Sequence, residues 1–261
     1  MRALKIAATG MLAQQMRVET ISNNLANMST TGYNARRAEF ADLHYQQMTR
    51  PGSINASDGT VLPTGVQLGL GVRPSAVSVN LAQGSLSATG GDLDVALDGN
   101  GFLEVTLPSG QNAYTRDGAL KRTAEGVIVT SDGYPVSPEI VIPNDARSVS
   151  INADGEVYVY FADATAAQLI GQFDIAGFAN AKGLEALGSN LFVETEASGP
   201  PLLTTPGEDG LATLRQGFLE DSSVDAVREI TDLIAAQRGY EMNSKVISAA
   251  DQMMGAMAQV R

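Results

Sequence analysis

Apolar residues recur every seven positions near the N-terminus, in two rows that are offset by three residues. The first row is Leu4, Met11, Val18 and Leu25, and the second is Ala7, Gln14, Ile21 and Met28. This heptad pattern predicts a helix of about 25 residues, roughly 37 Å long at 1.5 Å per residue. Because Gly32 provides a left-handed stop, we expect a helical segment over residues 1–32.

A second helical pattern covers residues 223–261. Ser222 or Ser223 can cap this helix, with Asp225 in its first turn. One apolar stripe consists of Val224, Val227, Ile230 and Ile234, and another of Val246, Ala250, Met253, Met257 and Val260. The pattern slips near Gly239, so we expect the stripe to rotate around the helix there. Amphipathic helices also occur in ordinary globular domains, but these two stand at the chain ends and flank a body without a comparable helix.

The body between the two helices has the pattern of antiparallel β-structure. Its apolar and polar residues alternate in short runs, which predict strands at 93–97, 102–107, 127–130, 149–151, 157–161, 168–178 and 190–194. Asp-Gly pairs separate many of these runs and favour hairpin turns with positive φ; they are Asp58-Gly59, Asp98-Gly99, Asp117-Gly118, Asp132-Gly133, Asp154-Gly155 and Asp209-Gly210. The predicted fold class is therefore α+β, with a helical coiled-coil inner domain and a β-rich outer domain.

Two loose stretches bracket the β body. Residues 46–75 are rich in Pro and Gly, yet Val66, Leu68, Leu70 and Val72 alternate strictly, which favours an extended β arm over a disordered linker. A second Pro/Gly-rich stretch covers 198–210. We expect an N-terminal helix at 1–32, a connecting segment at 33–75 with the arm at 46–73, the outer domain at 76–200, a return connector at 201–222 and a C-terminal helix at 223–261.

The composition excludes several classes of site. The chain of 261 residues has no Cys, no Trp and one His, which excludes thiolate metal sites, disulfides and Cys nucleophiles. The formal net charge is -12, and the excess of acidic residues is concentrated in residues 46–223, which hold eight Lys/Arg and 21 Asp/Glu. Such a chain is not expected to bind nucleic acid. The N-terminus mimics a weak secretory signal, but the helical pattern continues through it, and no apolar run is long enough for membrane insertion.

No catalytic constellation emerges from the remaining candidates. Asp92, Asp94 and Asp98 are close in sequence, but turn carboxylates explain them better than a calcium site or an acid–base pair. His44 stands alone, so we expect a surface or interface residue. The sequence predicts no enzyme, no cofactor and no metal.

The apolar helices instead predict self-assembly. Each stripe is too long and too apolar to be covered by one antiparallel partner. An apolar stripe that stays exposed to solvent marks an association surface. The predicted assembly seam consists of Leu4, Met11, Val18, Ile21, Leu25, Met28, Val227, Ile230, Ile234, Val246, Met253 and Met257.

Several motifs, in the same order along the chain, resemble those of the flagellar rod and hook axial protein family. The N-terminal motif is Asn23-Asn24-Leu25-Ala26-Asn27 followed by Thr31-Gly32-Tyr33, with Asn34 where the family usually has Lys. The middle matches are the stretch from Gly91 to Phe102, Tyr114-Thr115-Arg116-Asp117-Gly118, and the stretch from Thr130 to Val136. The C-terminal motif holds Gln237, Arg238, Tyr240 and Asn243, with Gly239 for the family's Ala. The matches extend over the whole chain.

The resemblance implies a structural protein of the bacterial flagellar basal body. Within the family, residues 46–73 are similar to an extra segment of the distal-rod type, and this intersubunit arm contains Pro51, Pro63, Gly65, Leu68 and Gly69. The implied partners are further copies in a helical tube, proximal rod proteins, the hook protein, the L- and P-ring bushing and the flagellar export apparatus. The implied location is the periplasm-spanning rod, reached without a cleaved signal peptide.

Three alternatives stay open at the level of sequence. The first is a proximal rod protein of the same family, which is closest in size. The second is an extracellular β-rich binding module, which would remain a folded monomer. The third is a glycosidase, for which the Asp92 and Asp94 region is the only candidate carboxylate pair.

Overall fold

The computed structural model describes residues 2–50, 64–161, 166–208 and 210–259, with side chains described up to residue 256. These residues form two compact units. The first combines residues 1–25, 36–78 and 226–261, and the second combines residues 26–35 and 79–225. Each unit is therefore assembled from segments that are far apart in the sequence.

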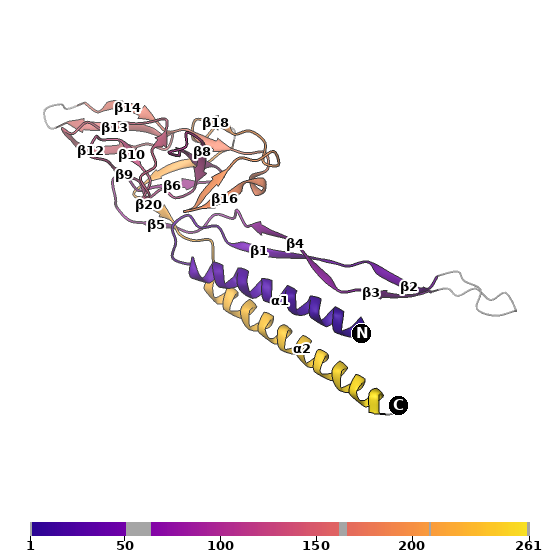
Figure 1. Ribbon diagram of the computed structural model, residues 1–261. Coiled ribbons are helices and arrows are strands. Elements are labelled where there is room, and N and C mark those ends of the chain that lie inside the picture. The colour runs from indigo at the N-terminus through magenta and orange to yellow at the C-terminus, as the bar shows by residue number, and fades with distance from the viewer. Residues whose placement is uncertain (1, 51–63, 162–165, 209, 260–261) are drawn as a thin grey trace. The chain divides into compact units, whose positions relative to one another are not determined.

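The first unit contains both long helices and a β ribbon (Figure 1). Helix α1 (Arg2–Ala26) lies antiparallel to helix α2 (Ala226–Gln259), so the two chain ends lie at the same end of the helix pair. The ribbon pairs β1 (Arg36–Asp42) with β4 (Val72–Val79), and β2 (Tyr45–Thr49) with β3 (Val66–Gly69). The expected arm is thus a two-stranded ribbon in its described part.

The second unit is built from short antiparallel strands. Its largest sheet has seven strands: β16 (Glu185–Gly188), β17 (Leu191–Val193), β8 (Asn112–Thr115), β7 (Phe102–Thr106), β15 (Ile175–Gly177) and β18 (Leu202–Thr204) in spatial order, with β11 (Val136–Ser137) also on β7. A three-stranded sheet follows the order β12 (Ala146–Ile151), β13 (Glu156–Phe161), β14 (Gln168–Gln172). The remaining pairs are β5 (Leu86–Ala88) with β20 (Phe218–Glu220), β6 (Val95–Asp98) with β19 (Thr213–Gln216), and β9 (Lys121–Arg122) with β10 (Ile128–Val129). A short 3-10 helix covers Ala181–Gly183.

Two apolar clusters stabilise the second unit. The larger one buries aliphatic side chains from many of these strands, including Leu97, Leu103, Ile128, Val157 and Ile175. The smaller one is aromatic: the ring centroids of Phe102 and Phe192 are 5.8 Å apart, and those of Tyr114 and Phe178 are 4.8 Å apart. Edge-to-face packing of this kind adds to the stabilisation from burial alone.

The fold confirms the predicted α+β class, with the terminal helices in contact and antiparallel strands between them. The helix boundaries differ from the sequence-based ones. Helix α1 ends at Ala26, before the end of the expected segment at 1–32, and α2 begins at Ala226, so Asp225 precedes the helix instead of lying in its first turn. The strand predicted at 168–178 is two strands, because β14 pairs with β13, whereas β15 pairs with β7 and β18 in the seven-stranded sheet.

The Asp-Gly pairs behave in two ways. Positive φ occurs in the glycines of four pairs: Gly99, Gly133, Gly155 and Gly210. Gly118 has no positive φ; a Cβ there would lie 1.6 Å from Val95 O, so glycine is needed for close approach of two backbones. Asp58-Gly59 lies outside the described residues.

Candidate assembly surface

Polar side chains tie α1 to α2. Arg17 forms an ion pair with Asp232 at 2.8 Å. The Asn24 amide, which is 1% exposed, donates to Glu229 Oε1 at 3.1 Å. Burial raises the pKa of Glu229 above its ordinary value, against the hydrogen bond from Asn24, which lowers it. Charged and amide side chains therefore help to hold the antiparallel pair of α1 and α2 together.

Asn24 also fixes the chain where it leaves α1. Its Nδ2 donates to the carbonyl oxygen of Arg36 and its Oδ1 accepts from the Arg36 N–H, both at 2.8 Å. An amide side chain is suited to this reciprocal pairing because it carries one donor group and one acceptor group. The motif residue Asn24 thus joins α1, α2 and β1.

Small residues fill much of the surface between the helices. The buried apolar residues of the pair are Ala7, Ala13, Ile21, Ala236 and Ala250. Gly10 faces Asn243, and Gly239 faces Gln14. Since most of these side chains are small, pairing within one chain covers little of the apolar surface of α2.

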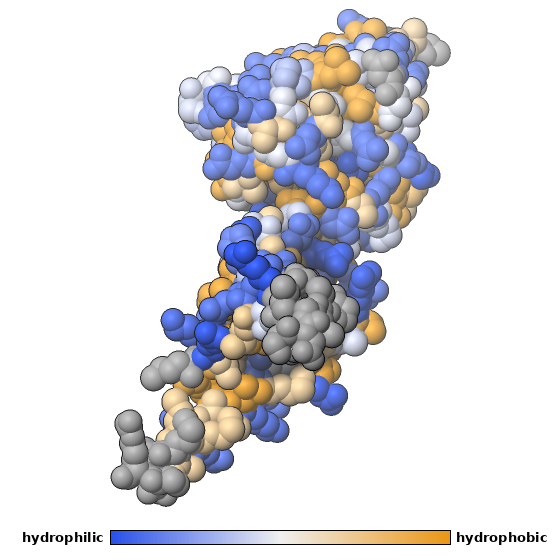
Figure 2. Space-filling view, turned by 90° about the vertical axis from the view of Figure 1, so that its right-hand side faces the viewer, coloured by the Kyte–Doolittle hydropathy of each residue, from blue (hydrophilic) through white to orange (hydrophobic). Residues whose placement is uncertain are grey.

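The predicted seam residues of α2 accordingly remain at the surface. Val227 is 76% exposed, and the exposed set also includes Ile230, Ile234, Val246 and Met253. On the N-terminal side Ile21 is buried, Leu4, Met11, Val18 and Leu25 are half-buried, and Met28 is exposed beyond the end of α1. The side chain of Met257 lies outside the described part. We call Ile230, Ile234, Val246 and Met253 together the apolar stripe of α2; the first two belong to the first predicted stripe and the last two to the second, which is rotated around the helix. Apolar surface along the helical unit is visible in Figure 2.

The remaining C-terminal motif residues share this exposure. Gln237, Arg238 and Tyr240 are exposed on α2, whereas Asn243 is half-buried against Gly10. Of the N-terminal motif, Asn27 accepts a hydrogen bond from Thr30 in the turn after α1. The structure thus separates motif residues that hold the fold from motif residues that face solvent.

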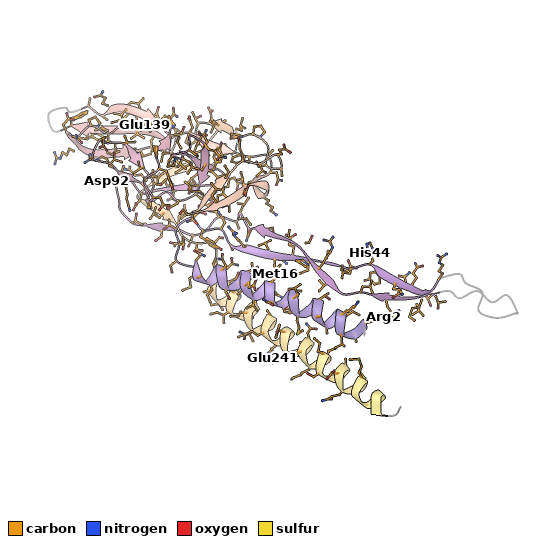
Figure 3. The ribbon with its side chains drawn as sticks, viewed as in Figure 1. Arg2, Met16, His44, Asp92, Glu139 and Glu241 are labelled. Carbon is orange, nitrogen blue, oxygen red and sulfur yellow. The ribbon has the colours of Figure 1, made fainter. Side chains whose placement is uncertain are left out.

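The ribbon presents a second apolar surface. Tyr45, Met48, Val66 and Leu68 are each 45% exposed or more, and Leu70 is 40% exposed. Tyr45 pairs with Gly69, and its ring lies 3.5 Å from the position of a Cβ at that glycine. Gly65 is half-buried just before β3, whereas Pro51 and Pro63 lie outside the described residues. His44 is exposed between β1 and β2 (Figure 3).

The ribbon is joined to α1 at Gly71. This residue has φ +117°, and a Cβ on it would lie 2.3 Å from Thr9 Oγ1. Thr9 Oγ1 accepts from the Val72 N–H at 3.4 Å, and the Leu43 N–H donates to Gly71 O at 2.8 Å. Glycine is required here both for its backbone conformation and for the close approach of α1.

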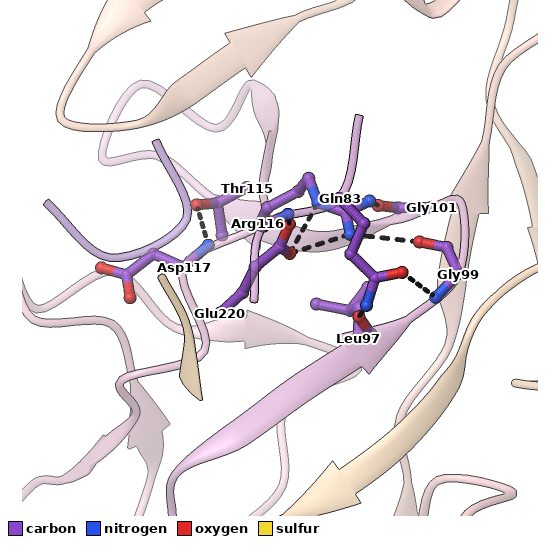
Figure 4. Close-up of polar contacts among 9 residues, drawn as sticks. Gln83, Leu97, Gly99, Gly101, Thr115, Arg116, Asp117 and Glu220 are labelled. Carbon is purple, nitrogen blue, oxygen red and sulfur yellow. Dashed lines mark hydrogen bonds and ion pairs between the residues drawn. The ribbon is translucent and has the colours of Figure 1, made fainter. Parts of the chain in front are cut away.

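A buried ion pair in the second unit joins Arg116, a residue of one family motif, to Glu220 (Figure 4). Arg116 and Glu220 lie 2.8 Å apart and are 4% and 3% exposed. The guanidinium also donates to Gly101 O at 3.0 Å and to Gly99 O at 3.1 Å. Glu220 Oε1 accepts from the Gly84 N–H at 2.9 Å. We call this group the Arg116–Glu220 clasp.

The N-terminal motif packs onto the clasp through Gly32. Its N–H donates to Glu220 O at 2.8 Å, and a Cβ on it would lie 2.9 Å from the Arg116 carbonyl group. Its φ of +65° is left-handed as predicted, but α1 ends at Ala26, so Gly32 does not terminate the helix. The neighbouring Tyr33 is 8% exposed, and its carbonyl oxygen accepts from Ser223 N–H at 3.0 Å. The segments entering and leaving the second unit therefore meet at one place.

The acidic candidates have local roles. Asp94 Oδ2 accepts from Thr89 Oγ1 in the turn before β6. Asp98 faces Arg215 at 3.7 Å on the surface. Asp92, labelled in Figure 3, accepts a hydrogen bond from Gln216 through its backbone oxygen. In the described part of the chain, no three His, Cys, Asp or Glu residues are placed to bind a metal, and no helix is long and apolar enough to span a membrane.

Three family profiles match the chain. They are described as "Flagella basal body rod protein" (residues 4–34), "Flagellar hook protein FlgE/F/G D1 domain" (96–159) and "Flagellar basal body rod FlgEFG protein C-terminal" (215–260). The flagellar basal-body rod protein FlgG of Caulobacter vibrioides is 51% identical over 261 residues, covering 100% of both chains. The chain belongs to the flagellar basal-body rod protein family.

Two further FlgG proteins support the same conclusion. FlgG of Agrobacterium fabrum is 49% identical and FlgG of Bacillus subtilis 35%, covering 97% and 100% of this chain and 97% and 99% of theirs. A crystal structure of the Helicobacter pylori hook protein FlgE2 shares 12% identity at a TM-score of 0.25, covering 71% of this chain and 43% of that one. The resemblance to the distal-rod type is confirmed, and with it a structural role in the basal-body rod.

Proposed function

We propose that this rod-family chain assembles with copies of itself into the distal rod, as a helical tube whose inner wall is made of α1–α2 pairs. The observation that carries the proposal is the apolar stripe of α2, which remains exposed after α2 has paired with α1. Burying a large apolar side chain contributes about 1.5–3 kcal/mol, so a second copy that covers the stripe gains substantially. A repeated contact between different faces of identical chains generates a helical filament.

The arm is the second part of this proposal. Val66 and Leu68 give one face of the ribbon an exposed apolar surface that a neighbouring subunit can cover, and Tyr45 is exposed on the other face beside Gly69. A ribbon anchored at one end to α1 and packed on the next copy would stiffen the tube. The wider partners are the proximal rod proteins, the hook protein and the L- and P-ring bushing. The tube encloses the export channel, carries torque across the periplasm to the hook, and receives subunits exported without a cleaved signal peptide.

The experiment compares two double variants of the full chain. Ile230→Glu with Ile234→Glu places two charges on the apolar stripe, where each side chain is 47% exposed. Thr231→Glu with Ala235→Glu adds the same charge at the same spacing to exposed positions one residue further along α2, about 100° around the helix, and is the matched control. We expect the first variant to keep the wild-type thermal midpoint but to stay monomeric, whereas the control forms rods, as judged by sedimentation and electron microscopy.

Two results would contradict the proposal. Normal rods from the Ile230/Ile234 variant would show that the stripe is not an interface. A wild-type chain that remains a folded monomer at high concentration, with and without pre-formed rods as seeds, would favour a monomeric binding module instead.

A further inference from the structure

The two terminal helices meet through a reciprocal pair of contacts. Gly10 of α1 faces Asn243 of α2: a Cβ on the glycine would lie 2.9 Å from Nδ2 and 3.1 Å from Cγ. Gly239 of α2 faces Gln14 of α1 in the same manner, with 3.1 Å to Cδ and 3.3 Å to Cγ. Each helix thus supplies one glycine and one amide, and each amide occupies the space where the opposite helix lacks a side chain.

The heptad repeat alone does not fix how the helices are aligned. Apolar residues that recur every seven positions can pack equally well after a slip of one heptad, which moves a helix by about 10 Å along its axis. After such a slip Gln14 would face Val246 or Asp232 instead of Gly239, because these residues lie seven positions to either side. The amide then has no gap to enter.

The polarity of Gln14 fits a role in alignment better than a role in strength. Its Oε1 is buried and has no hydrogen-bond partner among the described residues. A buried acceptor left without a donor destabilises the paired state. Polar groups inside helix seams are best known for specifying register at a cost in stability.

We propose that the Gly10–Asn243 and Gly239–Gln14 pairs form a register lock, which selects one antiparallel alignment of α1 with α2 within a chain. The inference concerns a single chain, so it stands whether or not the chain assembles as proposed above. As a consequence, every copy of the chain presents the apolar stripe of α2 at the same axial position relative to α1.

The test uses the opposing effects of alanine in a helix and alanine in a tight contact. A Gly→Ala change inside a helix normally stabilises it, since alanine is the better helix former. Gly255 is the matched control, because it lies in α2 with no atom within 4 Å of its Cβ position. We expect Gly255→Ala to raise the thermal midpoint measured by circular dichroism, Gly10→Ala to lower it, and Gly239→Ala to lower it less because its contacts begin at 3.1 Å.

Removing the opposing amide should reverse each loss. In Gly10→Ala with Asn243→Ala, and in Gly239→Ala with Gln14→Ala, the new methyl group has room, so the midpoint should return to the wild-type value or above. Loss of the amides should also broaden the register. Because the chain has no Cys, nitroxide labels can be placed at the exposed positions Lys5 with Glu241, and Glu19 with Asp251.

The label distances report alignment independently of stability. A narrow distance distribution is expected for the wild-type chain, and in the quadruple variant that combines both relieved pairs a heptad slip lengthens one label pair and shortens the other by up to about 10 Å. The proposal is overturned if Gly10→Ala and Gly239→Ala raise the midpoint as Gly255→Ala does. It is also overturned if the quadruple variant keeps the wild-type distances, or if the wild-type distribution is already broad.

Discussion

Replacing Glu220 by Gln removes one charge from the Arg116–Glu220 clasp while nearly preserving its shape. Arg116 would remain buried, with only neutral acceptors for its guanidinium: the carbonyl oxygens of Gly99 and Gly101 and the single oxygen of the new amide. Removing one partner of a buried ion pair costs about 3–5 kcal/mol, because the other charge stays buried without its counter-ion. At about 2–4 °C per kcal/mol for a domain of this size, the midpoint of the second unit should fall by roughly 6–20 °C.

The chain contains a matched control for this prediction. Asp98 and Arg215 lie 3.7 Å apart with side chains 48% and 47% exposed, so Asp98→Asn removes one charge from an ion pair in water. Exposed pairs of this kind contribute about 0–1 kcal/mol, so the control should barely change the midpoint. Both variants are measured by differential scanning calorimetry and by urea unfolding followed through near-UV circular dichroism.

A third variant separates charge from hydrogen bonding. Arg116→Met with Glu220→Leu removes both charges. It also leaves the Gly84 N–H and the carbonyl oxygens of Gly99 and Gly101 without these hydrogen-bond partners. We expect it to recover part of the loss caused by Glu220→Gln, not all of it. If Glu220→Gln and Asp98→Asn differ by less than about 1 kcal/mol, the clasp does not hold the second unit together and the reasoning is refuted.

Three further predictions concern other sites. Burial raises the pKa of Glu104 above its ordinary value; the carboxylates of Asp174 and Glu194 add to the shift, and a hydrogen bond with Ser137 opposes it. The native state therefore keeps the Glu104 proton to a higher pH than the unfolded state does, so the free energy of unfolding falls as the pH rises from the ordinary pKa of the carboxyl to its raised native pKa. Glu104→Gln should therefore be more stable than wild type in urea at about pH 7, with the advantage vanishing in acid; equal stability at neutral pH would contradict this. Gly71→Ala should destabilise the first unit more than Gly110→Ala destabilises the second, because Gly110 also has positive φ but no atom within 4 Å of its Cβ position. Adding Thr9→Ala to Gly71→Ala should remove the difference in a protease-protection assay; equal losses would exclude the close contact with α1. Deleting residues 46–73 should give curved or loose rods in electron micrographs, and straight rods of normal stiffness would argue against the arm.

The sequence predicts the long-period features of this fold well. The heptad rows locate α1, and Gly32 has the predicted left-handed conformation. The alternation at Val66 and Leu68 predicts the ribbon, whose described part is β2 paired with β3. These features depend on residues within a few positions of one another, which is why a pattern along one chain reveals them.

Contacts between distant segments were not predictable in this way. Arg116 and Glu220 are 104 positions apart, and nothing around Glu220 distinguishes it from other acidic residues of the β body. The presence of Arg116 in a family motif was the one available signal. The sequence also predicts the contact between α1 and α2 only in part, because a search for apolar residues passes over glycines and amides. The residues where the two helices touch include Gly10, Gln14, Gly239 and Asn243.

The division of the first unit among three segments has a consequence for the order of folding. Residues 1–25 and 226–261 belong to the same unit, so α1 has no α2 to pair with until almost the entire chain has been delivered, whichever end emerges first. The second unit, drawn largely from the continuous stretch 79–225, can form in the meantime. Once the second unit has folded, its contacts of Gly32 with Glu220 and of Tyr33 with Ser223 join the chain after α1 to the chain before α2, so pairing of the helices then closes only a short loop. The α1–α2 pair, which displays the apolar stripe of α2, is therefore completed last, after the second unit has folded.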